Sequence, residues 1–102
     1  MKKIKNLVLV VLFFATATIL AQTKISGIVL DETGQPLPGA NVVEKGSSNG
    51  TSTDFDGNFV LKVKSNKGVA IISFVGYKNT YTAYTKGGDI GSIQLVPDGN
   101  TL

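Results

Sequence analysis

The sequence contains no cysteine, no histidine and no tryptophan. Without histidine the chain lacks both the usual general base at neutral pH and the commonest metal ligand. Without cysteine it can form no disulfide, no thiolate nucleophile and no zinc–thiolate cluster. A serine or threonine nucleophile would still need a base, and the candidate lysines and carboxylates are scattered along the chain. The sequence therefore predicts a protein that is not an enzyme, with no catalytic residue, no metal and no cofactor.

The first 21 residues have the pattern of a secretory signal peptide. Three lysines within the first five residues precede an uncharged, largely apolar run of 14 residues, from Leu7 to Leu20. This run is shorter than the roughly 20 residues that a membrane-spanning helix needs. A small residue, Ala21, then precedes the polar Gln22. We expect a helical signal peptide over residues 1–21, cleaved between Ala21 and Gln22; an uncleaved N-terminal anchor is the alternative.

The charge of the predicted mature domain argues against nucleic-acid binding, and the absence of cysteine argues against lipid attachment. The formal net charge of +3 comes entirely from the three lysines of the predicted signal, so cleavage leaves seven lysines against seven acids. A neutral domain with scattered lysines has no basic stripe for nucleic acid. Because the chain has no cysteine, it also cannot receive the lipid that a cysteine at a new N-terminus would carry. We expect an exported protein with no direct membrane anchor of its own.

The remaining residues read as one all-β domain over residues 22–96. Short runs rich in valine, isoleucine, threonine and tyrosine alternate with clusters of glycine, proline, asparagine and aspartate. We expect six to seven strands in a small immunoglobulin-like or transthyretin-like (prealbumin-like) β-sandwich, with a loose tail over residues 97–102. The run 69–75 is apolar on both faces, which predicts a central strand covered on each side. The predicted buried residues are Phe59, Leu61, Ile71, Ile72 and Phe74.

Two Xaa-Gly pairs predict turns, and a tyrosine-rich run offers a candidate binding surface. Asn49-Gly50 and Asp56-Gly57 predict reversals with positive φ. Asp54, Asp56 and Asn58 alternate as at the start of a calcium loop, but the glycine and glutamate that an EF-hand requires are absent, so we predict turn residues; a weak cation site is the alternative. Tyr77, Tyr81 and Tyr84 cannot share one face of a strand, which favours ordinary packing over a sugar-binding platform.

Several blocks together resemble a known family. They are Gly27-Ile28-Val29 with Asp31, residues 34–42, Gly50-Thr51, residues 53–59, and Phe74-Val75-Gly76-Tyr77. In this order they resemble the carboxypeptidase-regulatory-like domain, in particular the N-terminal extension of SusC/RagA-type TonB-linked outer-membrane receptors of Bacteroidetes-type bacteria. The residues that carry the resemblance are structural: Gly27, Asp31, Gly34, Pro36, Leu37, Pro38, Gly39, Ala40, Gly50, Thr51, Asp54, Asp56, Gly57, Phe59, Gly76 and Tyr77.

The resemblance implies a function as a protein-binding module. A domain of this kind would lie in the periplasm, associated with the outer membrane, and would contact the plug or barrel of a receptor or the TonB machinery that energises it. We expect it to be a monomer. The alternative is a free-standing exported protein that binds a glycan or a surface polymer, motivated by the threonine- and tyrosine-rich run 77–85.

Overall fold

The computed structural model describes residues 23–99, so the expected signal peptide and its cleavage site between Ala21 and Gln22 lie outside the described residues. Within this range the chain forms strands and turns without a helix, and no segment of it could cross a membrane as a helix. This confirms the expected all-β fold, with seven strands. They are β1 (Thr23–Leu30), β2 (Asn41–Glu44), β3 (Gly50–Ser52), β4 (Asn58–Val63), β5 (Gly68–Ser73), β6 (Thr80–Tyr84) and β7 (Gly88–Gln94).

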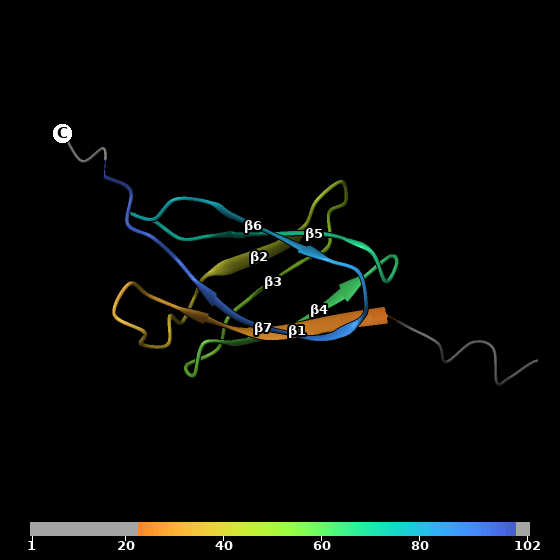
Figure 1. Cartoon of the computed structure of the whole chain (residues 1–102), viewed down its shortest axis with the longest axis horizontal. Helices are drawn as coiled ribbons and strands as arrows, with labels where there is room; N and C mark the ends of the chain where they lie inside the picture. The colour runs from red at the N-terminus through yellow and green to blue at the C-terminus, as the bar shows by residue number, and fades with distance from the viewer. Residues whose placement is uncertain (1–22, 100–102) are drawn as a thin grey trace, which may run out of the picture.

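The strands form two sheets packed face to face (Figure 1). One sheet has the order β4-β1-β7, in which β1 pairs antiparallel with β4 and parallel with β7. The other has the order β3-β2-β5-β6 and is antiparallel throughout. The chain crosses between sheets after β1, β3, β4 and β6, so both sheets depend on pairs of strands that are distant in sequence.

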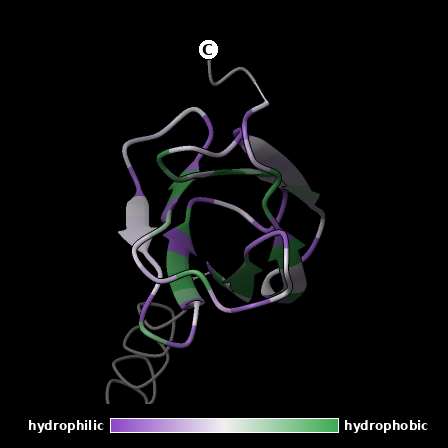
Figure 2. Ribbon diagram, turned by 90° about the vertical axis from the view of Figure 1, so that its left-hand side faces the viewer, coloured by the Kyte–Doolittle hydropathy of each residue, from purple (hydrophilic) through white to green (hydrophobic). Residues whose placement is uncertain are grey.

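The core lies between the sheets. In β4 the alternation predicted from the sequence is confirmed, because Phe59, Leu61 and Val63 are buried while the residues between them are exposed. Alternation places successive side chains on opposite faces, so one face of β4 packs inward and the other meets water. The end-on view shows the strands arranged around this interior, with apolar stretches on several of them (Figure 2). The fully buried residues from both sheets include Ile25, Val29, Val42, Ile72 and Leu95.

The expectation that the run 69–75 is covered on both sides is wrong. β5 does lie inside its sheet, between β2 and β6, but only Ala70 and Ile72 are buried. The opposite face of the strand is half-buried, including Ile71, and no other element of residues 23–99 forms a second layer above it. Phe74 follows the strand and is also half-buried, packed against the edge of the core. A two-layer sandwich covers one face of each sheet, and the apolar face of β5 that looks outward is shielded only by its neighbours.

The prediction that Gly50 provides the positive φ of the first turn is wrong. The chain does reverse between β2 and β3, but Gly50 lies in β3 opposite Val43 and its φ is not positive. Gly46 provides the left-handed residue of this turn instead, with φ of 84°. At the second predicted turn Gly57 does have a positive φ, of 77°. The asparagine and glycine at positions 49 and 50 therefore mark the hairpin without forming its tightest point.

The first residues of the predicted tail are paired. Lys78 N donates to Val96 O at 2.9 Å, Asp98 N donates to Gly76 O at 3.0 Å, and Pro97 forms an isolated bridge with Tyr77. These bonds hold the chain after β7 against the segment that leads into β6. Residues 100–102 lie outside the described residues, and the boundary of the tail stays a prediction.

Candidate interaction surface

Most of the residues that carry the resemblance come together at one end of the sandwich, the end that faces the viewer in Figure 2. We call it the motif end and define it by three loops: residues 31–39, residues 53–57 and residues 74–78. Val29 N donates to Gly57 O at 2.8 Å, and Leu37 N donates to Val29 O at 2.9 Å. A Cβ on Gly57 would lie 2.6 Å from Val29 O, so the close approach of these loops requires glycine there.

Thr53 fastens two of these loops together, and the sequence analysis did not single it out. Its side chain is buried, with 6% of its surface exposed. Thr53 Oγ1 donates to Leu37 O at 2.6 Å and accepts a bond from Ala40 N at 2.9 Å. Thr53 N also donates to Ala40 O, and Gly39 N donates to Thr53 O. A hydroxyl that both donates and accepts satisfies two backbone groups at once, which neither an apolar residue nor a carboxylate does.

Two aspartates close the turns of the motif end. Asp31 Oδ1 accepts bonds from Thr33 Oγ1, Thr33 N and Gln35 N, and these bonds, led by the threonine hydroxyl, lower the pKa of Asp31 below its ordinary value. Asp54 Oδ1 accepts bonds from Asp56 N and Asn58 N in the same manner. Each carboxylate oxygen thus bonds to backbone N–H groups a few residues ahead, which is the turn role predicted for Asp54. No group of acidic side chains within residues 23–99 is arranged to hold a metal ion.

Tyr77 connects the motif end to the chain after β7. Its ring lies 6.0 Å from that of Phe74, and its backbone bridges Pro97. A hydrogen bond to Glu32, burial and the negative charges of Glu32 and Asp31 raise the pKa of Tyr77 to about 12. The hydroxyl is therefore a neutral donor at any physiological pH, and it joins the first loop of the motif end to the third.

The remaining motif residues lie elsewhere. Gly27 is in the middle of β1, where an added Cβ would stand 2.7 Å from Gly91 O and 3.0 Å from the Phe59 ring. Phe59 can pack flat over β1 only because position 27 has no side chain. Gly50 and Thr51 lie in β3, away from the motif end. The motif residues in the three loops of the motif end are Asp31, Gly34, Pro36, Leu37, Pro38, Gly39, Asp54, Asp56, Gly57, Gly76 and Tyr77, and Ala40 directly follows the first loop.

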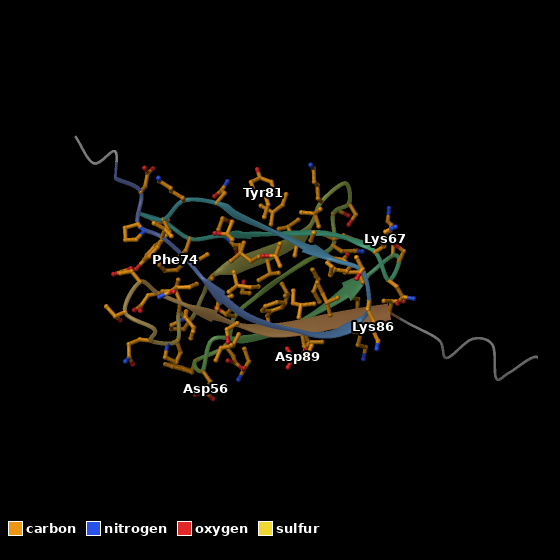
Figure 3. All side chains as sticks on the ribbon, viewed as in Figure 1. Asp56, Lys67, Phe74, Tyr81, Lys86 and Asp89 are labelled. Carbon is orange, nitrogen blue, oxygen red and sulfur yellow. The ribbon has the colours of Figure 1, made fainter. Side chains whose placement is uncertain are left out.

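Charge is separated between the two ends of the domain, although its net value is near zero. The motif end carries five acids: Asp31, Glu32, Asp54, Asp56 and Asp98. The opposite end, where β1 begins, carries six of the seven lysines of residues 23–99: Lys24, Lys45, Lys62, Lys64, Lys67 and Lys86. The seventh, Lys78, lies in the third loop of the motif end. In Figure 3, Lys67 and Lys86 lie at one end of the domain and Asp56 lies towards the other. The motif end also exposes large apolar side chains, since Phe55 is 92% and Val75 is 91% exposed.

A buried carboxylate organises the lysine-rich end. Glu44 is 6% exposed, and its two oxygens accept bonds from Ser47 Oγ, Asn49 Nδ2 and, at 3.0 Å, Lys64 N. The bond from Lys64 N is the main cause that lowers the pKa of Glu44 below its ordinary value of 4.5. The nearby Tyr84 hydroxyl is buried without a hydrogen bond of good geometry to any described residue. Burial, followed by the charge of Glu44, raises the pKa of Tyr84.

The structure argues against two other candidate sites, a serine nucleophile in residues 46–50 and a platform of three tyrosines. Residues 46–50 read Gly-Ser-Ser-Asn-Gly, which matches the G-x-S-x-G spacing of hydrolases and which the sequence analysis passed over. Residues 46–49 lie in the turn between β2 and β3 and Gly50 begins β3, so no helix follows the serine and the spacing does not form a nucleophile elbow. The three tyrosines do not form a platform, because Tyr84 is 4% exposed in the core whereas Tyr81 is 61% exposed on the outer face.

Two TonB-dependent receptors contain a segment that is similar in sequence to this chain. The chain is 42% identical over 78 residues to the TonB-dependent receptor SusC of Bacteroides thetaiotaomicron, which covers 76% of the chain and 8% of that receptor. It is 38% identical over 73 residues to the TonB-dependent receptor P39 of Formosa agariphila, which covers 70% of the chain and 7% of that receptor. The chain thus spans less than a tenth of the length of these relatives.

Solved structures share the fold at low sequence identity. A type II cohesin–X-dockerin complex from Acetivibrio cellulolyticus contains a chain that matches 74% of this one, and 58% of its own length, with a TM-score of 0.64 and 18% identity. The shaft pilin spaA of Lactobacillus rhamnosus GG matches 80% of the chain and 50% of its own length, with a TM-score of 0.50 and 14% identity. The model of the CarboxypepD_reg-like domain matches residues 25–101, so the chain belongs to the CarboxypepD_reg-like domain family.

Proposed function

We propose that this chain is a non-enzymatic protein-interaction module in the periplasm, forming the N-terminal extension of a TonB-dependent outer-membrane receptor. The observation that carries the proposal is the similarity to such receptors over at least 70% of the chain in the two relatives described above. The residues that the family pattern shares serve packing, turns and loop contacts. The partners that fit this role are the plug or barrel of the same receptor and the machinery that energises it.

The motif end is the surface we assign to that contact. Phe55 and Val75 are almost fully exposed in two of its loops, and Val96, which accepts a bond from Lys78 in the same loop as Val75, is 56% exposed. Exposed apolar side chains in loops cost solvation free energy that a protein contact recovers. The surrounding acids keep the surface soluble when it is free and favour a partner with basic groups around an apolar centre.

Deletion of this domain from a full-length receptor that carries it tests the proposal. We expect slower import of the receptor's substrate, or less receptor assembled in the outer membrane. A double variant, Phe55→Ser with Val75→Ser, should reproduce part of the loss while leaving the fold intact. Val60→Ser is the matched control, because Val60 is 59% exposed on the outer face of β4, away from the motif end. Normal import and assembly after deletion would remove the proposal.

Export is tested separately. Expressed with its own N-terminal segment in a Gram-negative host, the chain should lose residues 1–21 and be recovered from the periplasm as a soluble monomer that starts at Gln22. Intact mass of the periplasmic fraction measures this. A full-length precursor that stays in the inner membrane and resists carbonate extraction would contradict both the signal peptide and the periplasmic location.

The alternative of a glycan-binding protein has lost part of its motivation. It rested on the tyrosines of the run 77–85, and Tyr84 packs into the core, where no sugar can stack on it. Tyr81 is exposed, but Lys45 Nζ lies over its ring, 6.0 Å from the ring centre, and competes for the same face. The tyrosines of this run therefore form no stacking platform that would favour glycan binding over protein binding.

A further inference from the structure

The sandwich has four edge strands, and three of them carry features that hinder pairing with another chain. β3 has three residues. β4 contains the charged Lys62, and it lies next to β3, the edge strand of the other sheet. β7 is interrupted by a bulge in its pairing with β1, with positive φ at Gly88 and Gly91. Short length, charged residues and bulges are the devices by which proteins protect sheet edges.

β6 has none of these devices within its length. Its sequence is Thr80-Tyr81-Thr82-Ala83-Tyr84, five residues without charge, glycine or proline, and it pairs with β5 on one side. Threonine and tyrosine are among the residues that favour strands most. Charge appears only beyond the two ends, at Lys78 and Lys86. β6 is therefore an intact edge with a lysine on each flank.

The direction of the free backbone groups follows from the register. Lys45 N donates to Val69 O at 2.9 Å, so the backbone of Val69 points towards β2. Successive residues of a strand point their N–H and C=O groups to opposite sides, so Ala70 and Ile72 point towards β6. Their partners there are Thr82 and Thr80. The residues between and beyond them, Tyr81 and Ala83, must direct their N–H and C=O groups away from the sheet.

We propose that the outer edge of β6 binds an extended polypeptide segment of a partner protein as an added strand, and that this segment carries acidic residues at its ends. The bond-forming groups are the outward N–H and C=O of Tyr81 and Ala83, and the acids of the partner lie against Lys78 and Lys86. Strand addition of this kind draws its affinity from main-chain bonds and its selectivity from the side chains around them. The inference goes beyond the proposed function, because the β6 edge is a second surface that meets the motif end only at Lys78 and that selects an acidic segment.

A second copy of this chain fits the edge poorly. Two β6 edges can pair antiparallel in several registers. The register that pairs both outward residues of each copy within β6 places Tyr81 of one copy opposite Ala83 of the other. That register also places Lys78 of each copy opposite Lys86 of the other. Like charges directly opposite each other destabilise a strand pair, and here the repulsion occurs twice. The same two lysines favour a segment that has carboxylates in those places.

The test uses the purified chain and a short synthetic peptide of alternating threonine and valine with a glutamate at each end. Hydrogen exchange of the free protein should show rapid exchange of the Tyr81 and Ala83 amides and slow exchange of those of Thr80 and Thr82. Saturating peptide should slow the first pair. An otherwise identical peptide with lysine at each end should bind more weakly, and the difference should shrink as salt is added.

Two variants isolate the edge. Ala83→Pro removes an outward N–H and leaves the bonds to β5, so it should weaken peptide binding about tenfold, the loss of one or two backbone bonds. Ala83→Thr is the matched control, because it keeps the N–H and should bind like the wild type. Lys78→Glu with Lys86→Glu should reverse the preference between the two peptides. Exchange of the wild-type amides on peptide addition needs no variant, so the test holds even if Ala83→Pro fails to fold.

Three results would overturn the inference. One is no slowing of the Tyr81 and Ala83 amides at saturating peptide. Another is equal binding of the two peptides at low salt. The third is a wild-type chain that sediments as a dimer with these amides already protected, since a second copy would then occupy the edge. None of these depends on the deletion experiment: a receptor that needs the domain but whose β6 edge stays open refutes the edge site alone.

Discussion

Replacing Thr53 by valine tests whether the motif end is held by the two hydrogen bonds of one hydroxyl. Valine has nearly the same volume, so the change removes polar contacts and leaves the packing. Ala40 N then has no acceptor in a position where Ala40 is 0% exposed, and Leu37 O loses its 2.6 Å donor. A buried group left without a partner costs about 1–3 kcal/mol, and the half-buried carbonyl adds less. We expect Thr53→Val to lower the free energy of unfolding by about 2–3 kcal/mol.

This loss is large relative to the whole. At roughly 0.05–0.15 kcal/mol per residue, a domain of this size has a total stability of about 4–12 kcal/mol. Urea unfolding followed by circular dichroism measures the change, since the chain has no tryptophan for fluorescence. With a urea slope of about 1–1.5 kcal/mol per molar, the midpoint should fall by roughly 2 M at unchanged slope.

Two controls accompany it. Thr53→Ser keeps the hydroxyl and loses a methyl group, so it should cost about 1 kcal/mol and less than the valine. Thr51→Val changes a half-buried threonine of β3 that has no side-chain hydrogen bond to a described residue, and should stay within about 0.5 kcal/mol of the wild type. If Thr53→Val were as stable as the wild type, the hydroxyl bonds would contribute nothing and the account of the motif end would fail.

Three further changes test other parts of the domain. Ile72→Ala should cost about 2–5 kcal/mol and Ile71→Ala clearly less, because Ile72 is fully buried and Ile71 half-buried; equal urea midpoints would contradict the assignment of the inner face of β5. The pKa of Glu44 is lowered below 4.5, so the carboxylate stabilises the fold fully above that pH and loses this effect as the pH falls through the folded pKa. Glu44→Gln should therefore be less stable than the wild type at pH 7, and the difference in melting temperature should narrow towards pH 3. A difference in melting temperature that stays constant with pH would refute the role of the charge. Tyr84→Phe deletes a buried hydroxyl without a partner and should leave stability unchanged or raise it by up to about 1 kcal/mol; a loss of that size in urea unfolding would show a bond that the geometry does not.

The sequence predicted the fold well where local rules suffice. Alternation of apolar and polar residues in β4 and the turn glycine at position 57 both have causes within a few residues, and both are confirmed. The number of layers did not follow from any local rule. The run 69–75 is apolar on both faces, yet the second face lies on the outside of a two-layer sandwich. Only the packing of the whole chain decides which apolar face is covered.

The candidate surface also has features that the sequence predicts and features that only the tertiary structure decides. The sequence by itself indicated the family, because its ordered blocks of glycine, proline and aspartate resemble the CarboxypepD_reg-like domain, and the model of that domain matches residues 25–101. It also determined that Asp54 closes a turn, since its bonds run to residues four or fewer positions away. Hydrogen bonds between residues this close in the chain can be predicted from the order of the residues alone.

Tertiary structure alone decided what lies together in space. Thr53 bonds Leu37 across 16 positions, Glu44 bonds Lys64 across 20, and Gln94 reaches the carbonyl of Asp31 across 63. It also separated acids from lysines in a domain whose composition is neutral, and it left β6 as the intact edge by placing β3, β4 and β7 where they are. The physical reason is that strand order and pairing are set by long-range contacts between sheets, and the partners in such contacts are not neighbours in the sequence.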